Sequence, residues 1–436
     1  MKFVNLEEKE FDKFASKHPY TSFYQTSSWG HLKESNGWNM HLLGVKDNNK
    51  VIAATLLLSK KIPIGYYMFY APRGFLIDYN NFEILDFFTK NIKKYTKERK
   101  GIFIKIDPYI SYQERDINGN IVEGGKNNKT AFENLVKLGY KHFGFNIMQD
   151  TLQPRWMFVT DTKNETTESI MKKMDPKTRQ ILHKCERLGI YTREIDYEEL
   201  PKFKDIMEKT GERREFIDRP LAYYQEMYKH LHNKGILKIL VAEINMKDLV
   251  RTTNNDITRL KNEIEERTYK HDNNIIKMNE SKYVSKQKEA QKELERLNNN
   301  LTKYKSLLET AGEIITLGGI LFLINDNEVL SLVGGSYEKY MDFQSAYAVH
   351  FAGMQYAIEN GYDRYNFYGI VGDFNEKNEL GGLYTFKKGF SGYVVELIGE
   401  FDLIISKPLY YLYNISFKVY HFIKNVKAKI CKKNEK

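Results

Sequence analysis

Residues 247–310 constrain the architecture of this chain more than any other segment. They include neither glycine nor proline, and 25 of them are charged. In the second half, apolar side chains alternate at spacings of four and three residues, the a and d positions of a coiled coil; they are Ala290, Leu294, Leu297, Leu301, Tyr304 and Leu308. The first half repeats the pattern more weakly, at Val250, Ile257, Leu260 and Ile264. A polar stretch at 271–281 separates the halves. We therefore predict an arm of two antiparallel helices of about 25 residues each, about 40 Å long.

The segments on either side of the arm resemble each other and predict two α/β units. In each, two strands precede a long helix, and a further strand begins directly after that helix. The first set lies at 51–58, 66–71, 82–99 and 101–107, and the second at 319–324, 329–333, 343–360 and 364–370. The predicted fold class is α/β (α+β). Its parts are a first domain at 1–150, a second domain at 151–246 and 311–400, the inserted arm at 247–310, and a basic, aromatic C-terminal tail at 401–436.

Composition and the ends of the chain predict a soluble cytoplasmic protein. Apolar residues make up 42% and charged residues 28%, which excludes a disordered chain. The two cysteines, Cys185 and Cys431, are too few for a disulfide framework or a four-cysteine zinc site. The N-terminus lacks the apolar core of a signal peptide. The apolar stretch at 314–324 is much shorter than the ~20 residues that span a bilayer.

The net charge of +10 is concentrated in two segments. Residues 247–310 contribute +3, residues 407–436 contribute +7 with eight lysines, and the rest of the chain sums to zero. Such segments either meet an anionic partner or form a solvated lysine-rich surface, and charge alone does not distinguish these. In the tail, apolar side chains lie on too many sides for a helix with one apolar face. Part of the tail should therefore pack on the body. Its basic end either forms a frayed helix in solvent or makes peripheral contact with an anionic membrane.

Several common catalytic motifs are absent from the sequence. It contains no G-x-x-x-x-G-K-[ST], H-E-x-x-H, C-x-x-C or G-x-S-x-G motif, so we predict no metal site and no nucleotide-driven or serine-hydrolase chemistry. His230 and His232 would face apart on a helix. An enzyme of this kind would work mainly by positioning two reactive partners.

An ordered series of short motifs resembles the Fem-type (FemXAB) aminoacyltransferases, which form peptidoglycan bridges. The series covers residues 20–402 and includes the position of the arm. Its members are FYQTSSWG at 23–30 followed by Lys33, PRG at 72–74, KIDP at 105–108, QPRW at 153–156, MDPKTR at 174–179, RREFIDRPLAY at 213–223, GGS at 334–336, YNFYGI at 365–370 and LYTFKKGF at 383–390.

The resemblance implies a fold and a reaction. It implies two GNAT-like domains with a coiled-coil arm inserted in the second. The reaction would transfer an amino acid from aminoacyl-tRNA to the stem-peptide amine of a peptidoglycan precursor, either lipid II or UDP-MurNAc-pentapeptide, in the cytoplasm. Apart from aminoacyl-tRNA as co-substrate, it would need no cofactor.

The resemblance also implies substrate-binding residues. Lys33 and Arg219 would hold the precursor diphosphate, which suits a lysine point charge and an arginine fork. Tyr223, four residues after Arg219 and expected on the same helix face, would position the muramyl or peptide part. Asp107, at the end of a strand, would act near the peptide, and Tyr337 is placed only loosely. Each has an ordinary alternative: a surface lysine, a core aromatic, or a turn-forming aspartate.

Lys387 and Phe386 are the residues we assign to catalysis, together with Asp107. Aminolysis of an ester passes through an oxyanion, which a cation can stabilise. Lys387 would supply that charge, and Phe386 would stack on the terminal base of tRNA. The ordinary alternative is a lysine in a basic loop.

Two other functions remain open at this stage. One is an acyl-CoA-dependent N-acyltransferase of the same fold. The absence of a Q/R-x-x-G-x-G/A phosphate loop from the sequence argues against it. The other is a non-enzymatic scaffold built around the coiled coil. The arm itself would contact either tRNA or a protein partner. Its lysines and glutamates alternate and form no one-sided basic stripe, so its charge pattern does not require tRNA as the partner.

Overall fold

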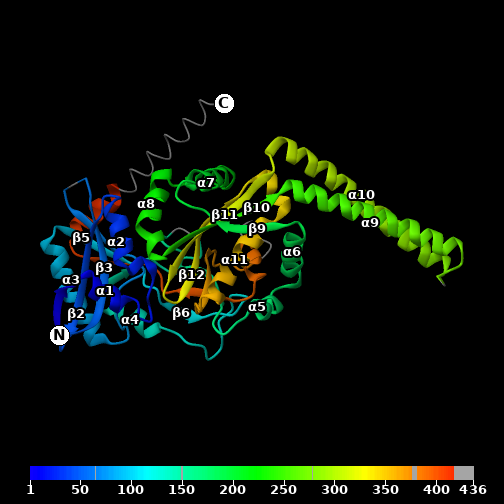
Figure 1. Cartoon of the computed structure of the whole chain (residues 1–436). Coiled ribbons are helices and arrows are strands. Elements are labelled where there is room, and N and C mark those ends of the chain that lie inside the picture. The colour runs from blue at the N-terminus through cyan, green and yellow to red at the C-terminus, as the bar shows by residue number, and fades with distance from the viewer. Residues whose placement is uncertain (64, 149–150, 277, 376–380, 417–436) are drawn as a thin grey trace.

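The computed structural model describes residues 1–63, 65–148, 151–276, 278–375 and 381–416, and within them the chain forms two β-sheets (Figure 1). The first sheet has seven strands in the order β1 (Lys2–Asn5), β2 (Asn39–Asp47), β3 (Lys50–Lys61), β4 (Tyr67–Ala71), β5 (Gly101–Ile106), β15 (Phe401–Ile404) and β7 (Tyr140–His142). Only β4 and β5 pair in parallel, and α3 (Phe82–Glu98) joins them. Leu85, Phe88 and Ile92 of α3 are buried against this sheet.

The second sheet repeats this plan with eight strands. Their order is β6 (Ser111–Glu114), β14 (Tyr393–Leu397), β8 (Trp156–Asp161), β13 (Arg364–Ile370), β12 (Glu328–Ser336), β11 (Ile314–Asn325), β10 (Leu237–Asn245) and β9 (Ile190–Glu194). Here β12 and β13 are the parallel pair, joined by α11 (Ser345–Glu359). The repeated β-α-β unit confirms the predicted mixed α/β class with two sheets.

Shorter helices cover the two sheets. Those of the N-terminal part are α1 (Glu8–Ala15), the 3₁₀ turn η1 (Phe23–Gln25), α2 (Ser27–Glu34) and α4 (Lys129–Lys137). Those around the second sheet are α5 (Thr167–Lys173), α6 (Pro176–Arg187), α7 (Leu200–Arg214), α8 (Leu221–Leu231), η2 (His232–Lys234), η3 (Glu338–Phe343) and α12 (Gly381–Lys388). Within the described ranges, no helix combines the length and the apolar character needed to cross a bilayer.

Two short strands cross between the parts that the sequence predicted as separate. The predicted tail at 401–436 begins with β15, which lies inside the first sheet between β5 and β7. Phe401 and Leu403 of β15 are buried in the core of that sheet. Conversely, β6, from the first 150 residues, is the edge strand of the second sheet beside β14. Four residues are too few to show a strand period, so neither exchange could be predicted from the sequence pattern. The rest of the tail, 417–436, lies outside the described residues.

A shared apolar core joins the two sheets. Phe23, Trp29 and Leu32, from η1 and α2, belong to one buried cluster with Phe203 of α7 and Leu321 of β11. Because each of these side chains is almost completely buried, the relative position of the two halves is set by packing. Side chains from both halves can therefore act in one site.

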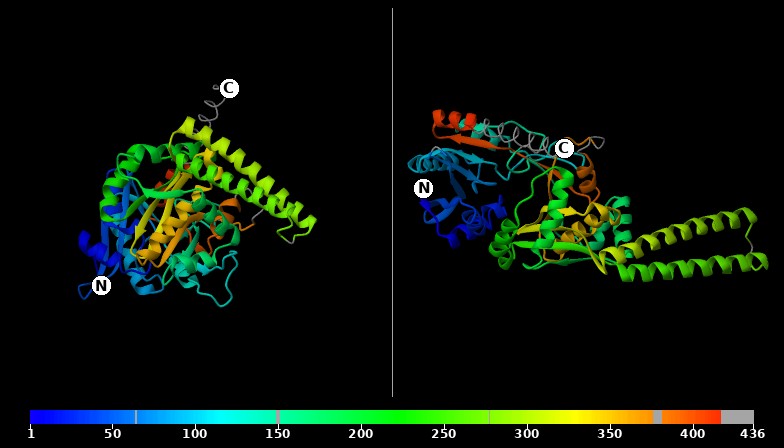
Figure 2. Two further views of the ribbon diagram at one scale, coloured as in Figure 1. Left: turned by 45° about the vertical axis from the view of Figure 1, so that its right-hand side comes forward. Right: turned by 90° about the horizontal axis from the view of Figure 1, so that it is seen from above.

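The arm is a pair of long helices, α9 (Met246–Asp272) and α10 (Glu280–Ala311), which project away from the body (Figure 2). Near the tip, the ring of His271 stacks on Tyr283 at 3.7 Å between centroids. At the base, Leu249 and Tyr304 belong to the core of the second sheet, and Tyr304 stacks on Phe343. The predicted two-helix arm is thus confirmed, with helices slightly longer than expected.

Candidate active site

Lys33, Tyr223 and Arg219 meet where α2 contacts the start of α8. Thr26 caps α2 by accepting a hydrogen bond from the Trp29 backbone N–H at 3.2 Å, and Lys33 lies in the last turn of this helix. The Lys33 Nζ donates to the Tyr223 hydroxyl at 3.2 Å and lies 4.3 Å from the centroid of the Trp29 ring. The Arg219 guanidinium lies 5.3 Å from the centroid of the Tyr223 ring. The structure therefore brings together three of the predicted substrate-binding residues.

One detail of that prediction is wrong. Pro220 is the N-cap of α8, so Arg219 precedes the helix and does not share a helix face with Tyr223. Proline cannot donate a backbone N–H and commonly begins a helix, which explains the boundary. The guanidinium reaches the Tyr223 ring from the loop instead.

Neither Lys33 nor Arg219 has a carboxylate partner in the described part of the chain. Among the described residues, no acidic side chain lies within ion-pair distance of Lys33 or Arg219. The nearby Asp218 instead accepts from Lys204 at 2.9 Å and from Tyr224 at 2.6 Å. Burial, together with the charges of Arg219 and Lys60, lowers the pKa of Lys33 to about 8. A lysine whose pKa is lowered by burial and by a neighbouring cation is stabilised in its charged form by an anion, and a phosphate is suited to both Lys33 and Arg219.

Asp107 is buried directly after β5. One carboxylate oxygen accepts from the Arg73 backbone N–H at 2.8 Å, and the other from the Tyr70 hydroxyl at 3.1 Å. The Arg73 guanidinium lies 4.0 Å away and donates to the Pro154 carbonyl at 3.0 Å. Burial raises the pKa of Asp107 to about 6, although Arg73 opposes the rise. A carboxyl that titrates near 6 can exchange protons close to neutral pH.

Lys387 is buried, with 5% of its surface exposed, and its ammonium contacts strand β13. Its Nζ donates to the backbone carbonyls of Phe367 at 2.6 Å and Gly369 at 2.7 Å. The pairing of β13 with β8 is interrupted between Asn366 and Gly369, which makes these carbonyls available. Burial lowers the pKa of Lys387 to about 7. An ammonium has three N–H donors; the two carbonyls use two of them, and among the described residues no hydrogen bond engages the third.

Phe386 belongs to an aromatic cluster that includes His350, a neighbour of Lys387. Its ring lies 4.7 Å from Tyr347, 5.3 Å from His350 and 5.5 Å from Phe390, measured between centroids. It remains only partly buried, so an additional ring can stack on it. His350 was not predicted. It is buried beside Lys387, its Nδ1 lies 2.7 Å from the Tyr365 hydroxyl, and burial lowers its pKa to about 3, which keeps it neutral.

Tyr337 packs against the same buried cluster as Tyr223 but forms its hydrogen bond with another element. It precedes η3 at the end of β12, and its hydroxyl donates to Asp205 of α7 at 2.5 Å. In the described part of the chain, no hydrogen bond or ring contact connects it with Lys33, Asp107 or Lys387.

Sequence reasoning missed a group of residues that link these sites. Tyr24 and Tyr368 have their hydroxyls 3.0 Å apart, and the Tyr368 hydroxyl also donates to the Gln153 side-chain oxygen. All three stand in the family-like motifs, which marked them as interesting without giving them a role. Tyr24 and Tyr368 are separated by 344 positions, so no spacing rule could pair them.

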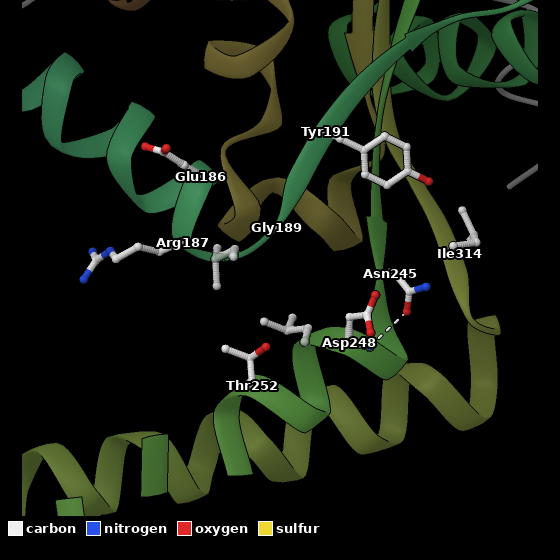
Figure 3. Close-up of a pocket in the computed structure, with 10 residues that line it drawn as sticks. Glu186, Arg187, Gly189, Tyr191, Asn245, Asp248, Thr252 and Ile314 are labelled. Atoms are coloured by element: carbon white, nitrogen blue, oxygen red, sulfur yellow. Dashed lines mark hydrogen bonds between the residues drawn. The ribbon is translucent and has the colours of Figure 1, made fainter. Parts of the chain in front are cut away.

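A pocket of about 310 Å³ lies elsewhere, at the base of the arm (Figure 3). It is formed where the end of α6 faces β9 and the start of α9, with Arg187, Tyr191 and Asp248 among its lining residues. Asn245 caps α9 there by accepting from the Asp248 backbone N–H at 2.9 Å. None of the seven predicted site residues, all of which the structure describes, lines this pocket. The described residues also contain no group of three or more His, Cys, Asp or Glu side chains suited to holding a metal ion.

Comparison with known proteins agrees with the motifs. Residues 6–418 match the FemAB family. The chain is 36% identical over 416 residues to aminoacyltransferase FemA of Staphylococcus epidermidis, covering 95% of this chain and 98% of that protein. It is 34% identical over 422 residues to aminoacyltransferase FemA of Staphylococcus aureus, covering 96% and 99%.

Solved structures give the same result. The crystal structure of FemX superposes with a TM-score of 0.76 at 28% identity, covering 94% of this chain and 99% of that chain. The family match spans nearly the whole sequence, and the FemA relatives are more than 30% identical over almost their full length. The chain therefore belongs to the FemAB family and is an aminoacyltransferase, as its motifs predicted.

Proposed function

We propose that this aminoacyltransferase moves an amino acid from aminoacyl-tRNA to the stem-peptide amine of a peptidoglycan precursor and so builds the interpeptide bridge. The observation that carries the proposal is the pair of separate cation sites. Lys33 and Arg219 have no carboxylate partner among the described residues, and the buried Lys387 keeps one N–H donor for a reacting oxygen. Such sites suit one substrate with a diphosphate and another with an activated ester.

In the proposed complex, Lys33 and Arg219 hold the diphosphate of lipid II or UDP-MurNAc-pentapeptide, and Tyr223 contacts the adjoining sugar or peptide. Asp107 lies near the acceptor amine. It is the one predicted carboxyl with a pKa of about 6, which suits it to accept the proton that the amine loses. Tyr337 stays assigned to substrate binding.

The transfer follows the chemistry of ester aminolysis. The stem-peptide amine attacks the ester carbonyl of aminoacyl-tRNA, the carbonyl oxygen becomes an oxyanion, and the terminal tRNA hydroxyl leaves. Lys387 donates a hydrogen bond to that oxyanion, which is stronger in the transition state than in the ground state. Phe386 stacks on the terminal base of tRNA and thereby orients the ester.

The remaining partners belong to the same proposal. We place the reaction in the cytoplasm, with the C-terminal segment in peripheral contact with an anionic membrane, and we assign the arm to tRNA in preference to a protein partner. An acyl-CoA donor is the second candidate for a GNAT-like fold. Family membership favours tRNA, and a scaffold would have no use for a buried ammonium aimed by two carbonyls.

One experiment tests the transfer. The purified full-length protein is incubated with mixed aminoacyl-tRNAs and, separately, with acetyl-CoA, each with lipid II or with UDP-MurNAc-pentapeptide. Mass spectrometry of the acceptor then reports the residue added and the number of additions. We expect aminoacyl addition that depends on Lys387. Addition from acetyl-CoA alone, or none from any donor, would contradict the proposal.

A further inference from the structure

Strand β13 contains a local distortion at Tyr368. The Phe367 and Gly369 carbonyls that bind Lys387 come from the residues immediately before and after it. Tyr368 has a φ of +64°, in the left-handed region that bulky residues seldom adopt. This backbone turn directs both carbonyls to the side of the strand on which Lys387 lies. Whatever holds Tyr368 in this conformation therefore also holds the acceptors of the Lys387 ammonium.

Three hydrogen bonds hold it there. The Tyr368 backbone N–H donates to the side-chain oxygen of Asn366, a fully buried residue, at 2.8 Å. The Tyr368 hydroxyl donates to Gln153, and because a phenol has one proton, the Tyr24 hydroxyl must donate to Tyr368 across 3.0 Å. Tyr24 is buried, with 4% of its surface exposed. A bond in such surroundings is expensive to lose.

Tyr24 connects this strand to the other predicted substrate site. It lies in η1, in the N-terminal part of the chain, and its ring contacts the Trp29 ring edge-on at 4.9 Å between centroids. Trp29 in turn lies beneath the Lys33 ammonium at 4.3 Å. Consecutive contacts therefore run from Lys33 through Trp29 and Tyr24 to Tyr368, and from its neighbouring carbonyls to Lys387.

We infer that Tyr368 is a positioning residue: anchored on Tyr24, it fixes the two carbonyls that aim the Lys387 ammonium, so that the Lys33 site and the Lys387 site keep one relative geometry. This inference rests on the proposed role of Lys387. It assigns no contact between Tyr368 and substrate. Its consequence is that the Tyr24–Tyr368 hydrogen bond affects turnover without contributing to the binding of either substrate.

The test compares Tyr368→Phe, Tyr24→Phe and the double variant in the aminoacyl-transfer assay. Each Phe keeps the ring and removes only a hydroxyl. We expect Tyr368→Phe to lower kcat by about tenfold to 100-fold, the range for small misplacement of a catalytic group, with little change in either KM. The double variant should be no worse than Tyr368→Phe alone, because that substitution already removes the bond. Tyr393→Phe is the matched control, since its hydroxyl contacts Asp161.

A second readout distinguishes positioning from general destabilisation. If Tyr368→Phe loosens the carbonyls, water should reach Lys387, and the alkaline limb of its kcat–pH profile should move to higher pH. Tyr368→Gly, which tolerates the same φ but loses the ring, should show the same shift. Thermal unfolding midpoints check that the variants are folded. If a Tyr368 variant does not fold, Tyr24→Phe tests the same hydrogen bond.

The outcomes separate this inference from the proposed function. If Lys387→Ala is inactive while Tyr368→Phe keeps full kcat and an unchanged pH limb, the inference is wrong and the proposed function stands. Losses from Tyr24→Phe and Tyr368→Phe that multiply as independent effects would also overturn it. Full activity of Lys387→Ala would overturn both.

Discussion

Burial determines how pH should act through Lys387. Because burial lowers its pKa to about 7, its charge changes close to neutrality. If the ammonium stabilises an oxyanion, its charged fraction and the rate both fall as pH rises past about 7. A lysine acting as a general base would give the opposite slope. The direction of the kcat–pH profile between pH 6 and 9 thus distinguishes the two roles, and we expect the falling one.

Removal of the same side chain should lower turnover more than binding. A single oxyanion donor contributes on the order of 2.7–4 kcal/mol, or about 10²–10³ in kcat. We expect Lys387→Ala to lose activity in this range with little change in precursor binding, measured by steady-state kinetics and titration of the precursor. Lys163→Ala, at an exposed ion pair with Asp363, is the control. A loss confined to KM would assign Lys387 to ground-state binding instead.

The Lys33 and Arg219 cations should show the reverse pattern. Arg219→Ala and Lys33→Ala each remove a charge from a site that has no carboxylate partner among the residues the structure describes, and hydrogen bonds to charged groups contribute about 1.5–3 kcal/mol. We expect precursor affinity to fall about tenfold to 150-fold while the KM for aminoacyl-tRNA is unchanged, as measured by calorimetry and kinetics. Lys90→Ala, in an exposed ion pair with Asp86 on α3 and away from the arm, serves as the control. Unchanged affinity in both variants would exclude a diphosphate at this site.

At the residue scale, the sequence identified the charged site residues, but it did not predict which residues surround them. The resemblance selected Lys33, Arg219 and Tyr223, which the structure places together. It did not indicate that Lys387 would be buried. In the sequence, the segment around Lys387 resembles a basic loop. It becomes buried only because this segment packs against β13 once the sheet has formed. The Tyr70 contact of Asp107 likewise depends on the pairing of different strands, which local spacing does not encode.

The same division applies to the elements of the fold. The arm and the two β-α-β units were predictable because they are long and periodic. Strands β6, β7 and β15 were not, since each has only three or four residues. Each of these strands pairs with a sheet edge that would otherwise be unpaired. Which edges are unpaired depends on the whole fold and not on the local sequence.

Strand β15 gives a direct test of that exchange. A chain ending at residue 400 lacks the strand between β5 and β7, loses the buried side chains of Phe401 and Leu403, and also loses Tyr410, which packs on β5. We expect this chain to be strongly destabilised, because deletion of even one large core side chain costs about 2–5 kcal/mol. A chain ending at 416 keeps β15 and should unfold at a midpoint close to that of the full protein. Equal midpoints for the two truncations, measured by circular dichroism, would contradict the assigned role of β15.

The arm should be removable only beyond its base. Leu249 and Tyr304 belong to the body core, so the shortened protein must keep them. Replacement of 262–293 by a short loop removes seven Lys or Arg and seven Asp or Glu, a net charge of zero. The body should stay folded, and if the arm binds tRNA, the KM for aminoacyl-tRNA should rise and its salt dependence should flatten, because fewer counterions are released on binding. Unchanged KM together with loss of a protein partner in pull-down would assign the arm to protein contact.

At the scale of the whole molecule, the C-terminal helix has one face packed on the body and one exposed apolar face. Residues 407–416 are helical, and Leu409, Tyr410 and Tyr413 pack on a small core that includes Ile102 and Phe103 of β5. The opposite side leaves Tyr411, Leu412 and Ile415 between 49% and 62% exposed. Three exposed apolar side chains in one helix are unusual unless they meet a partner, and residues 417–436, which follow them, carry seven lysines and one glutamate.

A membrane surface matches both properties, and vesicle co-sedimentation can test it. Each lysine near an anionic bilayer adds about 1 kcal/mol, so the chain ending at 416 should bind anionic vesicles far more weakly than the full protein. The triple change Tyr411→Ser, Leu412→Ser and Ile415→Ser should weaken the residual binding that salt does not screen, because buried apolar area drives it. Vesicles without anionic lipid are the control and should retain little of either protein. Binding that survives high salt, the truncation and the triple change alike would show that a different surface meets the membrane.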